Sequence, residues 1–335
     1  MDAWEFRAIT AYDISAIASL LIDRQNTEIR VYPSLRNICL NTRYITDTIV
    51  ELFHYSKIIG MGAFSHEELV GYIIGEIEID TVRGRHAWVP YEGLAIRADQ
   101  SPELIRYLYA KVAILWLEQG CFSHYALVPL GNQVYLDALM RLSFSIQQVH
   151  SIMSMTDYVP FENVSDCHVR LASINDRESI GRMSSIIYSH QNSSPVFEPA
   201  LPERIAAIKE GYKGTVEDSD STVLIATKDM KELGFQIYET ITPGLMIPDN
   251  GIELSVAGTY PLQMGNGIGK KLMNEGHRIM KEKGYSSIIT DWRITNLASS
   301  TFWPKCGFKP LAYRMVRYID KDVAWANFDN PSINL

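Results

Sequence analysis

The chain has 335 residues, 47% of them hydrophobic and 21% charged, and a formal net charge of −8. This composition excludes a disordered or collagen-like chain, and the lack of a basic domain argues against nucleic-acid binding. The sequence holds no apolar run long enough to span a bilayer and does not begin like a secretory signal, so we expect a cytoplasmic protein without membrane contact.

The first predicted elements already recur further along the chain. Arg7 and Asp13 reappear at an offset of 163 as Arg170 and Asp176, and later matches keep an offset of 164. Because the register holds from the first predicted strand to the last, we interpret the chain as two copies of one α+β unit. The predicted domains are residues 1–163 and 164–335.

Each copy is predicted to run strand, helix, helix, three strands, helix, strand, helix, strand. In the second copy the elements are strands at 223–226, 233–238 and 252–256, a helix over 269–283, a strand at 286–290, a short helix beginning after Asn296 and a closing strand over 311–319. Gly284 is expected to end the longer helix in a left-handed conformation. This order predicts a mixed, mostly antiparallel sheet flanked by helices.

A glycine-rich loop at residues 265–270 lies between a predicted strand and a predicted helix. Such a loop lets backbone N–H groups approach an anion, and the dipole of the following helix favours negative charge. The loop therefore predicts a pyrophosphate site. It is not a P-loop, because Lys271 stands where Ser or Thr is required, and the antiparallel hairpin before it argues against a Rossmann site.

Metal and charge patterns are less informative. Four scattered cysteines and eight histidines show no metal-binding spacing, so we predict no metal. Residues 1–165 carry 12 basic against 19 acidic residues, which places most of the negative charge in the first half. A cationic small molecule suits such a surface better than a nucleic acid does.

Residues 261–269, followed by a helix, a strand, Asn296 and Gly307-Phe308, resemble the GNAT superfamily of acetyl-CoA-dependent N-acetyltransferases. The resemblance covers about 170–319 and extends more weakly to 6–155. It implies two tandem GNAT-like domains. The second would use acetyl-CoA as cosubstrate to acetylate the primary amine of a small-molecule or peptide acceptor, acting as a monomer or homodimer. The alternative is a non-catalytic protein that binds or senses acyl-CoA.

The resemblance also implies site residues. Glu253 matches a general base, and Tyr188 and His190 would lie near the acceptor. Trp303 stands where the family places a tyrosine that protonates the leaving thiolate, so Tyr313, Tyr285 or water would have to supply that proton. The cofactor would contact Ala257, Gly258, Thr259, Met264, Gly265, Asn266, Gly267, Ile268, Gly269, Lys270, Asn296, Phe302 and Trp303.

Two departures from the family pattern matter. Met264 replaces the Arg or Gln that normally begins the loop. In the first copy, residues 101–105 replace the glycines, and Glu103 would repel a pyrophosphate. We therefore expect residues 1–160 to keep the fold but to bind acetyl-CoA poorly or not at all.

Overall fold

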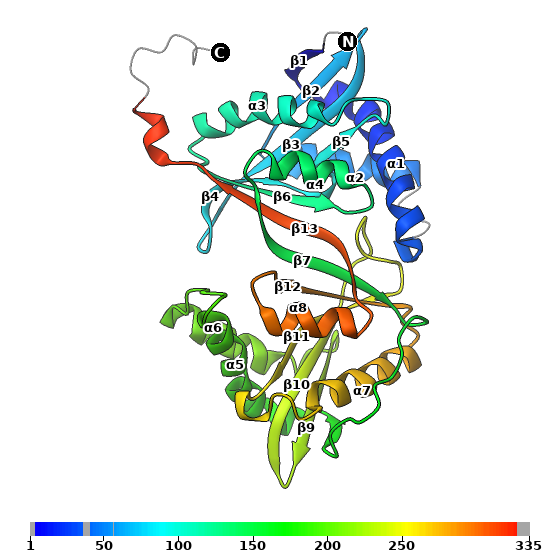
Figure 1. Cartoon of the computed structure of the whole chain (residues 1–335), viewed down its shortest axis with the longest axis vertical. Coiled ribbons are helices and arrows are strands. Elements are labelled where there is room, and N and C mark those ends of the chain that lie inside the picture. Colours follow the sequence, from blue (N-terminus) through cyan, green and yellow to red (C-terminus); the bar gives the residue numbers. More distant parts are fainter. Residues whose placement is uncertain (1–3, 36–40, 56, 327–335) are drawn as a thin grey trace. The chain divides into compact units, whose positions relative to one another are not determined.

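The computed structural model describes residues 4–35, 41–55 and 57–326 (Figure 1). Its contacts divide the chain into two compact units. Unit 1 comprises residues 1–147 and 311–335, and unit 2 comprises residues 148–310. The predicted domain boundary between residues 163 and 164 is placed from the sequence repeat, whereas the two units are defined by contacts. That boundary therefore stays a prediction.

Unit 1 is a mixed sheet with helices on both faces. In chain order it contains β1 Glu5–Ala8, α1 Ile14–Val31, α2 Thr42–Tyr55, β2 Ile58–Ser65, β3 Glu68–Asp80, β4 Gly84–Val89, β5 Leu94–Ile96, α3 Glu103–Glu118, β6 Ser123–Pro129, α4 Gln133–Met140 and most of β13 Lys309–Tyr318. The strand order is β1-β2-β3-β4-β6-β13, and β5 also pairs with β3.

Glycines on β3 let α3 approach the sheet of unit 1 closely. A Cβ at Gly75 would lie 2.5 Å from the ring of Trp116, and one at Gly71 would lie 3.0 Å from Leu104. Trp116 is fully buried and donates its indole N–H to the Ile59 carbonyl at 3.1 Å. The core of this unit is therefore centred between α3 and the middle strands.

Unit 2 repeats this architecture. It contains β7 Ser145–Ser154 from residue 148 onward, β8 His168–Leu171, α5 Arg177–Asn192, α6 Pro202–Gly214, β9 Ser221–Lys228, β10 Lys231–Thr240, β11 Gly251–Thr259, α7 Ile268–Glu282, β12 Ser287–Arg293 and α8 Leu297–Lys305. Its strand order is β7-β12-β11-β10-β9-β8. The predicted fold class is confirmed, and Gly284 has the expected positive φ of 92°.

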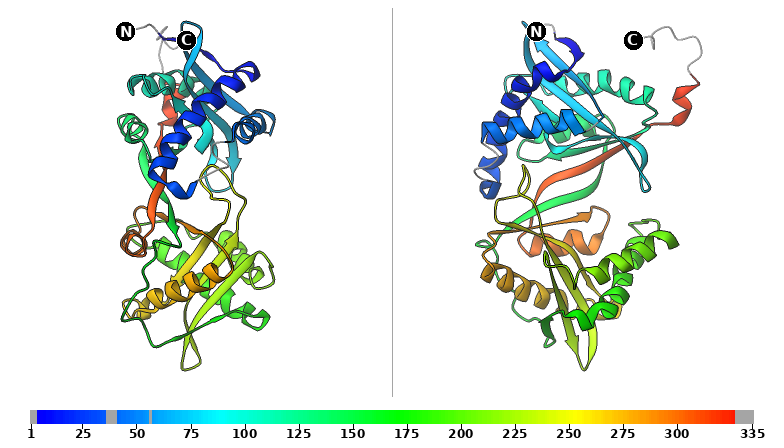
Figure 2. Two further views of the ribbon diagram at one scale, coloured as in Figure 1. Left: turned by 90° about the vertical axis from the view of Figure 1, so that its right-hand side faces the viewer. Right: turned by 180° about the vertical axis from the view of Figure 1, so that it is seen from behind.

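Alternate residues of β10 direct the helices of unit 2 to opposite faces. Phe235 and Ile237 pack into the cluster under α5, whereas Tyr238 lies under α7, where a Cβ at Gly276 would fall 2.1 Å from its hydroxyl. Two turned views of the ribbon show α5 and α7 on the two sides of these strands (Figure 2). One face of the sheet of unit 2 is thus covered by α5 and the opposite face by α7.

Unit 1 is formed mainly by the first repeat and unit 2 mainly by the second. The last strand of each repeat, however, pairs with a strand of the other unit. β13 closes the second repeat in sequence but pairs with β6 of unit 1, from Ala312 opposite Pro129 to Tyr318 opposite Ser123. β7 closes the first repeat but pairs antiparallel with β12 of unit 2. The predicted closing strand over 311–319 is therefore present, with a partner that its sequence does not reveal.

The repeated Arg and Asp form the same structure in both units. Arg7 makes two hydrogen bonds to Asp13 at 2.9 and 2.7 Å, and Arg170 makes two to Asp176 at 2.8 and 2.6 Å. Each aspartate also completes a capping box at the start of the first helical segment. The sequence repeat is thus a repeat of local structure.

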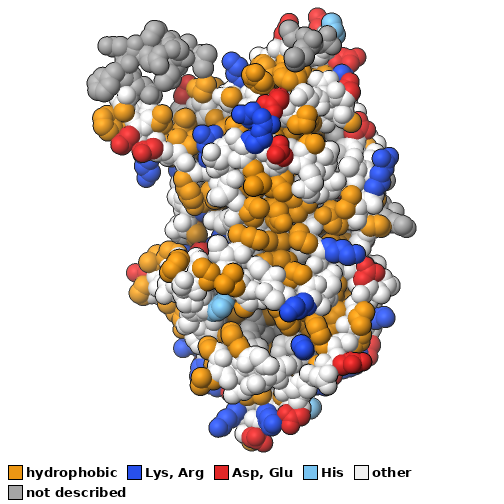
Figure 3. All heavy atoms as spheres, viewed as in Figure 1, with side chains coloured by type: hydrophobic (Ala, Val, Ile, Leu, Met, Phe, Trp, Pro, Cys, Tyr) orange, Lys and Arg blue, Asp and Glu red, His pale blue; other side chains and the backbone are white. Residues whose placement is uncertain are grey.

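Charges on the drawn face are mixed, and the described cysteines are buried. On the face drawn in Figure 3, acidic and basic side chains of the described residues are interspersed, without a continuous basic stripe. Within the described ranges, no helix combines the length and the apolar composition that crossing a membrane requires. Cys121, Cys167 and Cys306 are buried free thiols, and Cys39 lies outside the described residues.

Candidate functional site

The strands β11 and β12 of unit 2 begin side by side and then separate. They pair in parallel from Gly251 opposite Ser287 to Glu253 opposite Ile289. The Thr290 hydroxyl then donates to the Leu254 carbonyl at 2.8 Å, and no further ladder pair joins the two strands within the described part of the chain. The far half of β11 therefore keeps one backbone edge without a strand partner.

A bulge in the pairing with β10 shapes this half of β11. Ile237 pairs with Val256 but Tyr238 pairs with Leu254, so Ser255 is the extra residue. Its hydroxyl donates to the Ile237 carbonyl at 3.3 Å. A bulge bends and twists its strand, which turns the edge at residues 257–259 away from β12.

The glycine loop leads from β11 into α7. Gly265 and Gly267 have φ values of 82° and 74°, in the left-handed region that favours glycine. The first backbone bond of the helix runs from Lys271 to the Gly267 carbonyl at 3.0 Å. The amides at residues 268–270 therefore lack an acceptor within the helix, and together with the helix dipole they suit an anion.

The segment before β8 packs against this loop, which the sequence did not indicate. The Ser165 amide donates to the Gly267 carbonyl at 3.4 Å, and a Cβ at Gly267 would lie 2.9 Å from the Ser165 nitrogen. The Phe161 ring stacks on Phe302 with centroids 6.3 Å apart and lies 5.5 Å from the Lys270 ammonium group. Both the backbone conformation and the close contact with Ser165 therefore require glycine at position 267.

The end of β12 and the start of α8 bring two predicted residues together. Asn296 caps α8 by accepting the Ser299 amide at 3.1 Å, and its side-chain oxygen also lies 3.1 Å from Nε2 of His190. The predicted cap is confirmed. Trp303 is buried between Phe302 and Phe308, so its ring is part of the packing around α8.

Glu253 lies among carboxylates on the face of the sheet that carries α5. It is paired across the ladder with Glu239, and Asp291 lies two residues beyond its β12 partner Ile289. Burial raises the pKa of Glu253, and the charges of Asp291 and Glu239 raise it further. A carboxylate with a raised pKa is a better proton acceptor than an exposed one.

The other predicted residues are dispersed. Tyr188 lines a small depression between α5 and α6, together with Gln191, Glu198, Arg204, Ile205 and Ile208. Glu198 is held by Arg293 at 2.6 Å, which ties the loop before α6 to β12. Met264 is 46% exposed at the start of the glycine loop. Tyr313 lies on β13 in unit 1, so unit 2 does not gather it with Glu253.

Unit 1 fills the equivalent strand edge with its own side chains. Leu94 and Ile96 face the same β3 positions that Ala257 and Thr259 face on β10 in unit 2. Arg24 donates to the carbonyls of Tyr91 and Leu94, both at 2.6 Å. The hydroxyl of Tyr135 accepts the Ile96 amide at 3.3 Å.

The helix start and the base position of unit 1 also differ. The Leu104 amide at the start of α3 bonds to the Ser101 carbonyl at 3.0 Å, and Glu103 pairs with Arg106 and Arg141. Trp88 pairs with Glu76 as Glu253 pairs with Glu239, so an indole stands at the Glu253 position. These contacts leave no glycine cradle and no carboxylate at this place in unit 1.

The order of elements and the separated parallel strands give both units the fold of GNAT N-acetyltransferases, and unit 2 alone has the glycine loop. The sequence matches no protein-family model and no curated protein. Among solved structures, the chain is similar to a GCN5-related N-acetyltransferase from Sphaerobacter thermophilus, with 10% identity, a TM-score of 0.60 and coverage of 94% of this chain and 95% of the other.

Two further structures have the same fold. A tandem GNAT protein from the clavulanic acid biosynthesis pathway has 13% identity, a TM-score of 0.51 and coverage of 94% of this chain and 98% of the other. A glucosamine N-acetyltransferase region of a fungal multi-domain β-N-acetylglucosaminidase has 13% identity and a TM-score of 0.54, and the match covers 94% of this chain and 38% of the other. The tandem fold is therefore shared over nearly the whole chain.

Proposed function

We propose that this chain is an acetyl-CoA-dependent N-acetyltransferase whose catalytic site lies in unit 2. The observation that carries the proposal is the separation of β11 and β12 directly before a glycine loop that opens a helix. An extended acyl carrier fits the unpaired edge of β11, and its phosphates fit the amides at the start of α7. The shared fold supports the same assignment.

The cofactor contacts follow from these two features. The backbone at residues 257–259 would bond the pantetheine arm, and the amides at residues 265–270 would hold the pyrophosphate. Glycine at position 267 is required, because a side chain there would meet Ser165 and the φ of 74° would be strained. Asn296, Phe302 and Trp303 would border the cofactor from α8.

Acetyl transfer needs a neutral amine at the thioester carbon. Glu253 would take the proton from the acceptor ammonium group, directly or through one water. The amine nitrogen then forms a bond to the carbonyl carbon and releases its second proton to solvent, the carbon–sulfur bond breaks, and the electron pair leaves with the sulfur. Trp303 cannot supply a proton to that thiolate and the predicted Tyr313 lies in unit 1, so we propose that Tyr285 or water does so.

The carboxylates around Glu253 favour a cationic acceptor. Glu239 and Asp291 lie on the same face and form no ion pair within the described residues. Their negative potential would attract a protonated primary amine from a small molecule or a peptide. His190 and Tyr188, on the helix that covers this face, would contact the rest of the acceptor.

Thiol release from acetyl-CoA, measured with a panel of amines, tests the proposal. We expect release that depends on an amine and is lost in Glu253→Gln, while Glu282→Gln at the exposed end of α7 behaves like the wild type. Tight CoA binding without thiol release for any amine would instead indicate a non-catalytic acyl-CoA-binding protein.

A further inference from the structure

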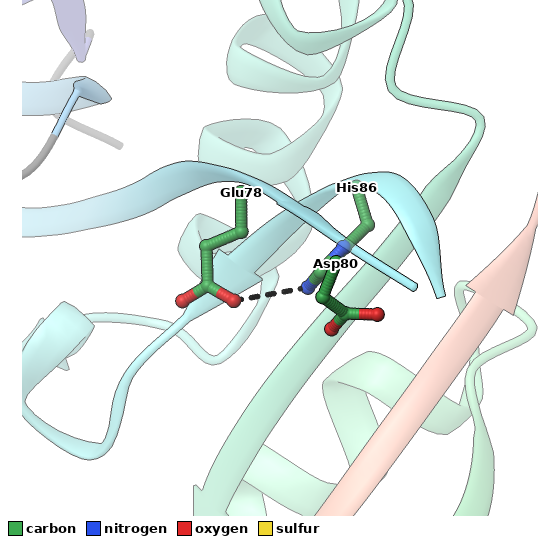
Figure 4. Close-up of side chains that lie close together, drawn as sticks. All are labelled: Glu78, Asp80 and His86. Atoms are coloured by element: carbon green, nitrogen blue, oxygen red, sulfur yellow. Dashed lines mark ion pairs between the residues drawn. The ribbon is translucent and has the colours of Figure 1, made fainter. Parts of the chain in front are cut away.

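Three potential metal ligands converge at the hairpin between β3 and β4 of unit 1 (Figure 4). Glu78 and Asp80 are two residues apart on β3, so their side chains leave the same face of the strand. His86 is the cross-strand partner of Glu78 on β4. One ligand atom from each residue lies within 4.8 Å of the other two.

The surroundings of His86 fix which ring nitrogen carries the proton. The side chain is fully buried, and Nδ1 lies 2.9 Å from the Gly84 carbonyl oxygen. A carbonyl only accepts hydrogen bonds, so Nδ1 donates to it and Nε2 is the ring nitrogen left to bind an ion.

A carboxylate lies close to Nε2. Nε2 lies 3.2 Å from Oε2 of Glu78, and it has no hydrogen-bond partner among the residues that the structure describes. A buried ring nitrogen that has no hydrogen-bond partner and lies this close to a carboxylate is satisfied by a cation that both groups bind.

We propose that Glu78, Asp80 and His86 bind a divalent transition-metal ion of the zinc class. Ligand atoms at about 2.0–2.2 Å from a tetrahedral ion lie roughly 3.4 Å from each other, close to the separation of Nε2 and Oε2. One imidazole nitrogen with two carboxylates suits zinc or cobalt, whereas calcium takes oxygen ligands only. The hydrogen bond from Nδ1 to Gly84 would orient the ring toward the ion.

Asp80 keeps capacity for such an ion. Its Oδ1 accepts the amides of Val82 and Arg83, and its Oδ2 accepts Nη1 of Arg83 at 2.7 Å. Each carboxylate oxygen has two lone pairs, so Oδ2 retains one. Glu78 and Asp80 are 39% and 31% exposed, which leaves the ion a path from solvent and room for a water ligand.

Cobalt and zinc titrations of the full-length chain, first freed of metal with a chelator, test this site. We expect one Co²⁺ per chain, with visible absorption bands of a low-symmetry site, and competition by Zn²⁺ but not by Ca²⁺. Glu78→Gln should weaken binding at least about tenfold. Glu68→Gln, at the exposed opposite end of β3, should leave it unchanged.

His86→Gln provides a second variant, checked for an unchanged circular dichroism spectrum. If that variant does not fold, Glu78→Gln decides the question, because Glu78 is partly exposed. The proposal is overturned if the wild type shows no saturable Co²⁺ absorption, or if Glu78→Gln binds as tightly as the wild type.

Discussion

Glu253 shows how neighbouring residues set the chemistry of a single side chain. Burial, Asp291 and Glu239 all raise its pKa, in that order of size. Below the raised pKa the group is protonated and cannot take a proton from an amine. A base of this kind becomes active as the pH rises through its own pKa.

The pH dependence of acetyl transfer should reflect this group. We expect kcat/KM to rise with pH, with a midpoint above the ordinary pKa range of glutamate. Glu239→Gln removes one negative neighbour and should shift this rising limb of the pH profile to lower pH. Initial rates of thiol release over a pH series measure both. An unchanged limb in Glu239→Gln would show that another group acts as base.

Glu253→Gln should lower kcat by about 10²–10⁴-fold, the usual contribution of a general base, while the dissociation constant of CoA stays the same. Thiol release measures kcat, and calorimetry measures the dissociation constant of CoA. Equal losses in rate and in CoA affinity would point to a structural role for the carboxylate.

Asp176 makes the stability of unit 2 depend on pH. The hydrogen bonds from Arg170 hold the pKa of Asp176 below its ordinary value, with burial acting in the opposite direction. A folded-state pKa below the unfolded one gives stability that is present above about pH 4 and is lost as the pH falls toward the folded-state value. Denaturant titrations should show this loss in the wild type and a flatter profile in Asp176→Asn.

At the scale of single residues the sequence predicts only part of the site. Asn296 follows from its place before a helix, and Gly267 from the loop. His277 on α7 is buried, lies 2.9 Å from the Met155 carbonyl and stacks on Tyr158. Its partners lie more than a hundred positions earlier, so no local pattern reveals them.

Among the elements, the two repeats differ at the strand edge that follows the point where the two parallel strands separate. Unit 2 leaves the edge of β11 without a strand partner, whereas in unit 1 Arg24 and Tyr135 bond the equivalent edge of β5. Arg24 is 4% exposed, and Glu28 beside it is fully buried. This filling supports the expectation that the first repeat binds acetyl-CoA poorly, on grounds separate from its missing glycines.

Removing Arg24 should therefore destabilise unit 1. Arg24→Ala removes the positive charge beside Glu28 and one hydrogen bond to each of two carbonyls, which we expect to lower the free energy of unfolding by about 3 kcal/mol. Arg43→Ala removes an exposed arginine and should change it by less than about 0.5 kcal/mol. Equal effects in a denaturant titration would contradict the assigned role of Arg24.

In the whole molecule, the repeat gave the order of elements but not the partners of the closing strands. The predicted order of elements places a closing strand over 311–319, and the structure confirms it. Such a strand would suit an edge in either unit, because pairing is formed by backbone groups that every strand offers. The exchange of β7 and β13 is therefore visible only in the structure.

The exchange predicts that the end of the chain stabilises its beginning. A chain ending at Pro310 lacks most of β13, so the amides of β6 should lose protection in hydrogen exchange, while those of β10 keep it. The full-length chain is the control. Unchanged protection of β6 would show that β13 is not needed to close unit 1.

The central claim is that the fold occurs twice but the acyl-CoA site only once, at the glycine loop of unit 2. Calorimetric titration of the full-length chain with CoA tests this most directly, with Gly267→Glu and Gly211→Ala as paired variants. Gly211 has open space around its Cα, so the second variant should bind normally. We predict one CoA per wild-type chain and none for Gly267→Glu. Two CoA molecules per chain, or normal affinity in Gly267→Glu, would contradict it.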